Sequence, residues 1–124
     1  MAARRLALTA DRSIGEQLAG WGKVALVETV GRSSGRPASA AVGFVEQDDG
    51  ILLVAAGTDT ADWALNLRSH PRCRATIGEA THDYVASELD DLEQAAAVTA
   101  LILKYGTPAE KLGHGPVFRL VRSS

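Results

Sequence analysis

Short apolar runs, bounded by turn residues, recur along most of this 124-residue chain. Runs of about four to eight apolar and β-branched residues between Gly, Pro, Asp or Ser are typical of β-strands. This pattern predicts six strands, over residues 23–30, 39–47, 51–56, 73–77, 81–88 and 116–122. The first run is almost continuously apolar, which predicts a strand that is buried on both faces. Gly43, inside the second run, predicts a place where a neighbouring group or a ligand needs room.

Helical spacing of apolar residues appears in three segments. Residues 11–20 predict a short helix, and residues 62–69 predict a second helix that begins at Asp62. Asp90 or Asp91 caps the third and clearest helix, which extends to Tyr105. A broad buried face is expected for this third helix. The residues predicted to form that face are Leu92, Ala95, Ala96, Val98, Thr99, Leu101, Ile102 and Leu103.

The order of these elements predicts a mainly β (α+β) fold. Strands and helices do not alternate strictly, which argues against a doubly wound parallel sheet. Six short strands with inserted helices favour a small antiparallel barrel with flanking helices. We expect an N-terminal tail and short helix over residues 1–22, and a single barrel domain over residues 23–124.

Composition limits the classes of partner and the compartment. The formal net charge of −2 gives no general attraction to nucleic acid or anionic membranes. No apolar run approaches the roughly 20 residues that span a bilayer, so we expect no transmembrane segment. The single cysteine, Cys73, cannot form an internal disulfide, which fits a reducing compartment. The sequence therefore predicts a soluble cytoplasmic protein.

The turn Gly31-Arg32-Ser33-Ser34-Gly35-Arg36-Pro37 is the strongest candidate for chemistry. Its backbone N–H groups, hydroxyls and two guanidinium groups can bind a phosphate or carboxylate. The same composition is also typical of a solvated hairpin turn, because such turns favour Gly, Ser and Pro. From composition alone, both interpretations stay open.

Other candidate residues carry weaker signals. Trp63 can lie against a flat ring system or serve as a core anchor. Tyr105 is a weak catalytic candidate, because its hydroxyl can point into a cleft, but the position favours a half-buried structural role. His70, His82 and His114 do not pair with Cys73 at a metal-ligand spacing, so no metal site is expected. No nucleophile-elbow motif is present.

Three segments in order resemble the deazaflavin-dependent nitroreductase family, a group of split β-barrels that use coenzyme F-420. The first segment, Thr29 to Pro37, is similar to the family's T-T-G-R-K-S-G-x-P. The second is Leu53 to Gly57. The third, Trp63 to Pro71, is similar to the family's W-Y-x-N-L-x-A-N-P. The resemblance covers about residues 23–121. It implies a six-stranded antiparallel split barrel, related to FMN-binding barrels that often pair as homodimers.

The resemblance also implies an activity and a site. The implied reaction is hydride transfer from reduced coenzyme F-420 to an electron-poor acceptor, such as a nitroaromatic, a quinone or an enone. The implied phosphate-tail residues are Arg32, Ser33, Ser34, Gly35 and Arg36. The residues implied to lie at the deazaflavin ring are Ala55, Ala56, Gly57, Thr58 and Trp63. The coenzyme supplies the hydride chemistry, and the protein supplies position and electrostatics.

This chain departs from the family pattern at several positions. Ser33 stands where the family usually has Lys, Ala38 stands in place of a basic residue, and Gly57-Thr58 replaces the usual Ser-Lys pair. Ala64 replaces the aromatic residue after the Trp, and Pro108 and Lys111 replace tyrosines of some members. Three alternatives therefore stay open: an FMN-binding barrel, a non-catalytic binding or carrier protein, and a dimerising barrel subunit of a larger assembly.

Overall fold

A computed structural model describes residues 22–106 and 114–123 of the chain. The predicted helix over residues 11–20 lies outside these described residues, as do Pro108 and Lys111. The described part contains seven strands and two α-helices, with a single 3-10 turn at Asp48–Gly50. No helix in the described ranges is long and apolar enough to cross a membrane.

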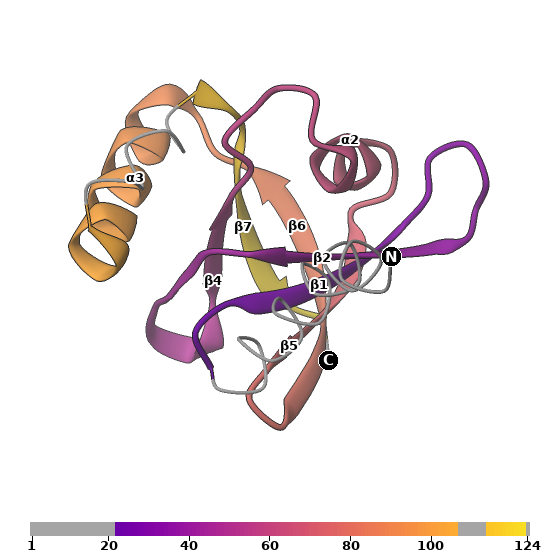
Figure 1. Cartoon of the computed structure of the whole chain (residues 1–124), viewed down its shortest axis with the longest axis horizontal. Helices are drawn as coiled ribbons and strands as arrows, with labels where there is room; N and C mark the ends of the chain where they lie inside the picture. The colour runs from indigo at the N-terminus through magenta and orange to yellow at the C-terminus, as the bar shows by residue number, and fades with distance from the viewer. Residues whose placement is uncertain (1–21, 107–113, 124) are drawn as a thin grey trace, which may run out of the picture.

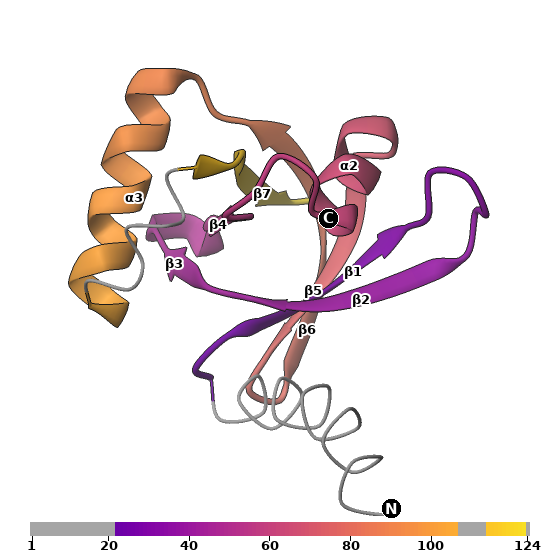
Figure 2. The same cartoon turned by 45° about the horizontal axis from the view of Figure 1, so that its top comes forward.

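The seven strands form one antiparallel sheet in the order β2-β1-β5-β6-β7-β4-β3. Their bounds are β1 Ala25–Val30, β2 Pro37–Val42, β3 Phe44–Glu46, β4 Leu52–Ala55, β5 Arg72–Ile77, β6 Ala80–Glu88 and β7 Val117–Arg122. The sheet curls strongly, with α2 (Asp62–Ser69) next to β1 and β2 and α3 (Asp91–Tyr105) beside β3 and β4 (Figures 1 and 2). The predicted antiparallel barrel with flanking helices is therefore confirmed.

The predicted second strand, residues 39–47, is two strands, so the sheet has seven strands and not six. β2 pairs with β1, whereas β3 pairs with β4 at the opposite end of the strand order. Gly43 separates them, and a Cβ placed there would lie 3.4 Å from the ring of Tyr105. The neighbour at Gly43 is therefore a side chain of α3, but 3.4 Å is an ordinary contact distance and an added methyl group would fit. The prediction that this position needs extra room is wrong in that respect.

Two apolar clusters meet at β4, in which all four residues are buried. Leu52 and Val54 face the central cluster inside the curled sheet, together with Phe118. Leu53 and Ala55 face a second cluster beneath α3. The prediction that the first strand is buried on both faces is wrong: Ala25, Val27 and Thr29 are buried, and the alternate residues are only half-buried. Two of the alternate residues, Glu28 and Val30, line an open cavity and are not packed in a core.

The helix α3 begins and ends as its sequence predicts. Asp90 is the N-cap: its carboxylate accepts a hydrogen bond from Glu93 N–H (2.8 Å), and the Glu93 carboxylate accepts one from Asp90 N–H (3.4 Å). Such a capping box satisfies two backbone donors that would otherwise lack partners. Gly106 ends the helix with φ 94°.

The predicted broad buried face of α3 is wrong in part. Of the eight residues assigned to it, only Leu101 is buried, and Val98 and Ile102 are half-buried. Ala97, which was not assigned, is buried beside Leu101. The sheet covers only one side of the helix, so the apolar residues on the opposite side stay in solvent. These exposed residues are Leu92, Ala95, Ala96, Thr99 and Leu103.

A buried amide fastens the β1–β2 hairpin to α2. Asn66 is only 3% exposed, and its Oδ1 accepts hydrogen bonds from Arg32 N–H (3.1 Å) and Arg32 Nη1 (2.8 Å). Its Nδ2 donates to Thr29 Oγ1 (3.1 Å), which in turn donates to Ala38 O (3.3 Å). One side chain of α2 therefore fixes the end of β1, the turn and the start of β2.

The C-terminal end of α3 is fastened in a similar way. The hydroxyl of Tyr105 donates to Lys23 O (2.7 Å) and accepts from Phe44 N–H (3.2 Å). The ammonium group of Lys104 donates to Phe44 O (2.8 Å) and lies 3.4 Å from the centroid of the Phe44 ring. Tyr105 therefore joins three parts of the backbone, which gives its hydroxyl a structural role.

We expect Asn66→Ala to lower the free energy of unfolding by about 2–3 kcal/mol, because Arg32 N–H and Thr29 Oγ1 lose their partner in a largely buried place. Urea denaturation followed by circular dichroism measures the change. Ser69→Ala, at an exposed position of the same helix, is the control and should change stability by less than about 0.5 kcal/mol. Equal effects of the two substitutions would contradict the role given to Asn66.

Removal of the Tyr105 hydroxyl should also destabilise the fold. Tyr105→Phe keeps the ring and removes the bonds to Lys23 O and Phe44 N–H, so we expect a loss of about 1 kcal/mol or more. Tyr84→Phe is the matched control, since the Tyr84 hydroxyl has no hydrogen-bond partner in residues 22–106 or 114–123. Thermal unfolding of both variants tests the difference, and a Tyr105→Phe melting temperature equal to that of the control would refute it.

Candidate functional site

The turn between β1 and β2 lies against the N-terminal end of α2. The guanidinium group of Arg32 pairs with the Asp62 carboxylate, with 3.1 Å between Nη2 and Oδ1, and its Nη1 lies 3.4 Å from Asp62 O. Asn66 holds the backbone and side chain of the same arginine. The two segments that the sequence predicted to form a site, residues 31–37 and the loop that leads to Trp63, are therefore neighbours.

The turn is compact, and its own atoms use several of its donors. Gly31 N–H donates to Arg36 O (2.8 Å), and Gly35 N–H donates to Gly31 O (2.9 Å). Gly35 has φ 71°, a conformation that favours glycine. A Cβ on Gly31 would lie 2.6 Å from Ser34 Oγ, which itself accepts from Arg36 N–H (3.1 Å). The donors left for a ligand are the exposed groups at the tip, chiefly those of Ser33 and Arg36.

The two arginines of the turn differ in availability. The side chain of Arg32 is 37% exposed and is held by Asp62 and Asn66. Arg36 is exposed, and within the described ranges its side chain forms no ion pair or hydrogen bond. An incoming anion therefore finds one free guanidinium group and one that already has a carboxylate partner.

The loop after β4 is held in place by the segment that precedes β7. Ala55 is buried and paired with Val117, and Ala56 N–H donates to Pro116 O (3.0 Å). A Cβ on Gly115 would lie 2.5 Å from Thr58 N, so the two backbones touch at this point. Gly57 has φ 80°. The N–H group of Ala56 is thus committed to Pro116 O, while Gly57 is half-buried and Thr58 is exposed.

Gly115 is a residue that the sequence analysis missed. Gln94 of α3 donates from Nε2 to Gly115 O (2.8 Å), which links α3 to the same loop. The requirement for glycine here comes from a contact with a residue 57 positions earlier, and not from a positive φ. No local pattern in the sequence indicates it.

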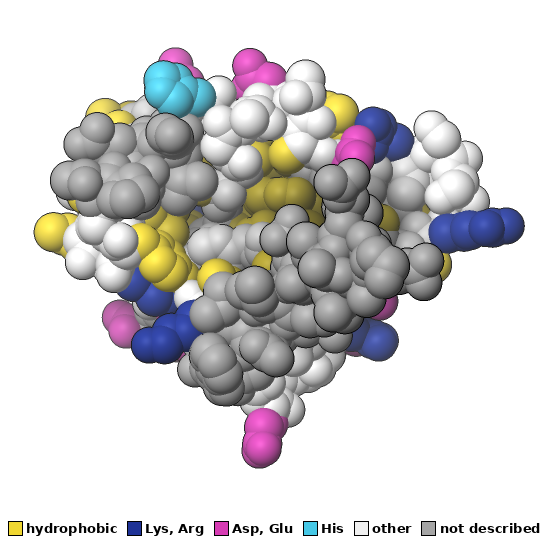
Figure 3. Space-filling model, in the orientation of Figure 1, with side chains coloured by type: hydrophobic (Ala, Val, Ile, Leu, Met, Phe, Trp, Pro, Cys, Tyr) yellow, Lys and Arg dark blue, Asp and Glu magenta, His cyan; other side chains and the backbone are white. Residues whose placement is uncertain are grey.

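Trp63 is half-buried and packs against the central core. Its ring centroid lies 6.0 Å from that of Phe118, with 56° between the planes. Figure 3 shows hydrophobic atoms at the bottom of a hollow between α2 and β2. The half-buried apolar residues that pack on the core from these elements and the loop before them are Ala40, Ala56, Ala61 and Trp63. Both interpretations of Trp63, core anchor and ring neighbour, are compatible with this position.

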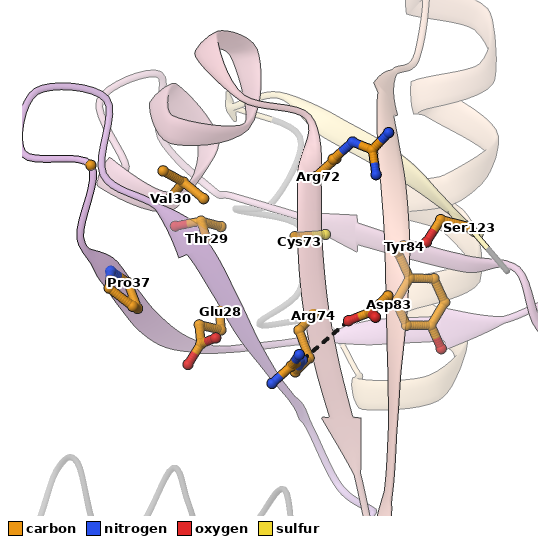
Figure 4. Close-up of a pocket in the computed structure, with 11 residues that line it drawn as sticks. Glu28, Thr29, Val30, Pro37, Arg72, Cys73, Arg74, Asp83, Tyr84 and Ser123 are labelled. Atoms are coloured by element: carbon orange, nitrogen blue, oxygen red, sulfur yellow. Dashed lines mark hydrogen bonds and ion pairs between the residues drawn. The ribbon is translucent and has the colours of Figure 1, made fainter.

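A cavity of about 320 Å³ lies beside the turn and is lined by residues of β1, β5 and β6 together with Gly35 and Pro37 (Figure 4). Glu28 and Arg72 line it, and the Arg74 guanidinium pairs with Asp83 at 3.1 Å between Nε and Oδ1. Burial raises the pKa of the Cys73 thiol in its wall to about 11, and the charge of Asp83 adds to the rise. The thiol is therefore protonated near neutral pH. The opposite charges balance, so the cavity does not select an anion.

Another ion pair fixes the far end of α2. Arg68 donates to both carboxylate oxygens of Glu88 on β6, at 2.9 and 2.8 Å. This hydrogen bond lowers the pKa of Glu88. α2 is thus held at its first turn by Arg32 and at its last turn by Arg68. In the part of the chain that the structure describes, no group of three His, Cys, Asp or Glu residues could hold a metal ion.

Known structures with low sequence identity share this fold. The heme storage protein HutZ from Vibrio cholerae has 22% identity and a TM-score of 0.68, covering 88% of this chain and 87% of HutZ. An F420-H2 dependent reductase, FDR-A, has 22% identity and a TM-score of 0.66, covering 79% of this chain and 93% of the reductase. A structure described as a domain-swapped dimer has 21% identity and a TM-score of 0.66, covering 92% and 98%. These similarities confirm the split β-barrel.

The sequence itself gives the more specific relationship. Residues 3–109, more than half of the chain, match the family described as F420H(2)-dependent quinone reductase. This match agrees with the motifs in the turn, in β4 and in α2 that indicate a deazaflavin-dependent split barrel. The protein is therefore a member of the F420H(2)-dependent quinone reductase family.

Proposed function

We propose that this protein transfers a hydride from reduced coenzyme F-420 to an electron-poor acceptor, with a quinone as the first candidate and nitroaromatics or enones as further ones. Family membership supports the coenzyme. The observation that carries the proposal is the contact of Arg32 with Asp62 and Asn66, because it sets a turn rich in anion-binding groups beside an apolar hollow. A coenzyme with a flat ring and an anionic tail needs such a pair of neighbouring surfaces.

The turn would hold the phosphate of the coenzyme. Ser33 and Ser34 would present N–H groups and hydroxyls, and Arg36 would supply the free guanidinium group. Gly35, whose N–H is bonded to Gly31 O, would contribute by fixing the shape of the turn around the phosphate. Arg32 would act mainly by holding the turn in place, with part of its charge directed at the phosphate. A charge-assisted hydrogen bond of this kind contributes roughly 1.5–3 kcal/mol. The loss of the family's lysine at Ser33 makes Arg36 more important in this chain.

The hollow would hold the deazaflavin ring. Trp63 would lie beside the ring, and Ala55 and Ala56 would keep the loop after β4 fixed in the sheet. Gly57 and Thr58 would supply the hydrogen bonds to the ring edge, since Gly57 is half-buried and Thr58 is exposed. Reduced coenzyme F-420 supplies the hydride, which carries both electrons to the acceptor, and water supplies the proton that completes the reduction. The chain itself would bind, orient and shield these reactants.

Two further properties belong to the proposal. FMN is the alternative cofactor, because its shorter phosphate tail needs fewer basic residues than that of coenzyme F-420. A cytoplasmic location is in keeping with the single cysteine, which is free and buried in the structure. Neither property follows from family membership, and the titration below separates the two cofactors.

Titration of the purified protein with coenzyme F-420, followed by quenching of the coenzyme's fluorescence, tests the tail site. We expect Arg36→Ala to weaken binding about tenfold or more, because it removes the only free cation of the turn. Arg122→Ala, which removes an exposed arginine from β7, is the control and should leave the dissociation constant unchanged. Wild-type binding of FMN without binding of coenzyme F-420 would show that the proposed coenzyme is wrong.

The contact between Gly115 and the ring loop gives a second test. Gly115→Ala places a methyl group 2.5 Å from Thr58 N, so the loop must move. We expect kcat/KM for reduction of menadione, a simple quinone, to fall about tenfold or more. Gly43→Ala adds a methyl group at an ordinary 3.4 Å contact with Tyr105 and is the matched control. Thermal melting of both variants shows whether they fold, and unchanged turnover in a folded Gly115→Ala protein would exclude this role.

A further inference from the structure

A second cavity, with a volume of about 120 Å³, lies beside the turn between β5 and β6. Its polar lining comes from three strands: Glu46 from β3, His82 and Tyr84 from β6, and Arg122 from β7. One water molecule needs roughly 10–15 Å³ of such space, so this cavity has room for a small organic molecule. Convergent polar side chains around a small cavity indicate a site for a polar ligand.

The cross-strand register brings three of these side chains together. Arg122 is the direct partner of Tyr84 on the neighbouring strand. Side chains of such partners emerge on the same face of the sheet, with about 4.5–5.5 Å between their Cβ atoms. His82, two residues before Tyr84 in β6, lies on this face as well. The His82 and Tyr84 rings meet edge to face, with 6.4 Å between their centroids and 89° between their planes. A guanidinium group, a phenol hydroxyl and an imidazole are therefore gathered at one place.

The guanidinium group of Arg122 lies against the 3-10 turn at Asp48–Gly50. A Cβ added to Gly50 would lie 3.0 Å from both Cζ and Nε of Arg122, so the guanidinium group occupies the space that a side chain would need. Within residues 22–106 and 114–123, the Arg122 side chain forms no ion pair or hydrogen bond. Its N–H donors are therefore available to a ligand, and the backbone of the 3-10 turn supports its position.

The Tyr84 hydroxyl is a second available donor. Tyr84 is only 3% exposed, and its hydroxyl has no hydrogen-bond partner within the described ranges. No fully buried side-chain oxygen in those ranges lacks a partner, so this hydroxyl reaches open space. Figure 4 shows it directed along β6 towards the start of that strand, where Ala80 and His82 line the second cavity. Polar groups inside a protein are normally hydrogen-bonded, and a ligand in this cavity would supply the bond.

Arg122 and Glu46 give the cavity one positive and one negative charge. The two groups do not pair with each other, and Glu46 has no other partner among the residues that the structure describes. A simple anion would be repelled by the Glu46 carboxylate, and a simple cation by the Arg122 guanidinium group. A molecule that carries both charges satisfies both groups. The cavity therefore favours a zwitterion.

The size of the cavity and its apolar wall narrow the choice of zwitterion. An α-amino acid carries its ammonium and carboxylate groups on one carbon atom, so both charges fit into a small space. The apolar part of the lining consists of Ala75, Ile77 and Ala80. These side chains offer contacts to a short aliphatic side chain and no hydrogen bond to a polar one.

We propose that this cavity binds a small aliphatic amino acid, such as alanine, as a zwitterion. The carboxylate accepts hydrogen bonds from Arg122 and Tyr84, and the ammonium group donates to Glu46. His82, whose neutral ring has one acceptor nitrogen, completes the polar side. The cavity is separate from the candidate coenzyme site. His82 and Glu88, which binds α2, lie six residues apart on β6, or about 20 Å at 3.4 Å per residue.

NMR of the ¹⁵N-labelled protein during addition of L-alanine tests the site. We expect saturable shifts of the backbone N–H signals of residues 75–77 and 82–84, with a dissociation constant of about 1 mM or tighter. Propionate, which lacks the ammonium group, and ethylamine, which lacks the carboxylate, should bind at least tenfold more weakly. Equal affinity for either analogue would overturn the proposal, and so would the absence of these shifts at about 50 mM alanine.

Substitutions in the polar lining test the assigned contacts. Tyr84→Phe removes a hydrogen bond to the carboxylate and Glu46→Gln removes the charge that pairs with the ammonium group, so each should raise the dissociation constant at least tenfold. Glu79→Gln, in the exposed turn between β5 and β6 and outside the lining, is the matched control and should bind like the wild type. Arg122→Ala should abolish alanine binding and leave the coenzyme titration unchanged, because the two sites are separate. Circular dichroism shows that each variant is folded, and wild-type affinity in a folded Tyr84→Phe or Glu46→Gln protein would refute the assignment.

Discussion

The buried amide of Asn66 is the interaction on which the geometry of the candidate site depends. It joins α2 to groups of β1 and of the turn at once, and it is only 3% exposed. A buried amide with an unsatisfied oxygen or nitrogen would cost on the order of 1–3 kcal/mol, so the hairpin cannot swing away from α2 without a large loss. The exposed Arg32–Asp62 ion pair also holds the turn against α2. The turn and the hollow are therefore kept at a fixed distance before any ligand arrives.

The curvature of the sheet explains why the hollow forms between α2 and β2. The segment from Pro37 to Glu46 supplies β2 at one end of the strand order and β3 at the other, so it ties the two edges together. Gly43 lies between the two strands, and Tyr105 and Lys104 of α3 bind the backbone of Phe44, the next residue. α2 then covers the side of the curled sheet next to β1 and β2. Among the described residues, a hollow with hydrophobic atoms at its bottom is left beside that helix (Figure 3).

The strands and helix ends could be predicted from the sequence because their signals are local. Turn residues bound the strands, and the capping box at Asp90 and the glycine at position 106 mark the ends of α3. The division of residues 39–47 into β2 and β3 at Gly43 could not be predicted, nor could the exposure of Leu92 and Leu103. Both depend on which elements of the fold pack against these residues. The same holds for Gly115, whose constraint comes from Thr58. Motifs in the sequence identified the segments of the candidate site, but no motif indicated the contacts that join these segments.

In the proposed site, the charge of the turn would decide what kind of anion binds. With Ser33 in place of the family's lysine, and Arg32 already paired with Asp62, the exposed tip keeps one free cation, Arg36. Such a turn depends on hydrogen bonds from N–H groups and hydroxyls more than on net positive charge. Donors of this kind are directional and select for the shape of a phosphate group, whereas the general attraction that several lysines exert is weakened by salt. The turn would therefore attract anions only weakly at long range but would present its donors in a fixed geometry. The contacts of Arg32 and Asn66 make the turn rigid.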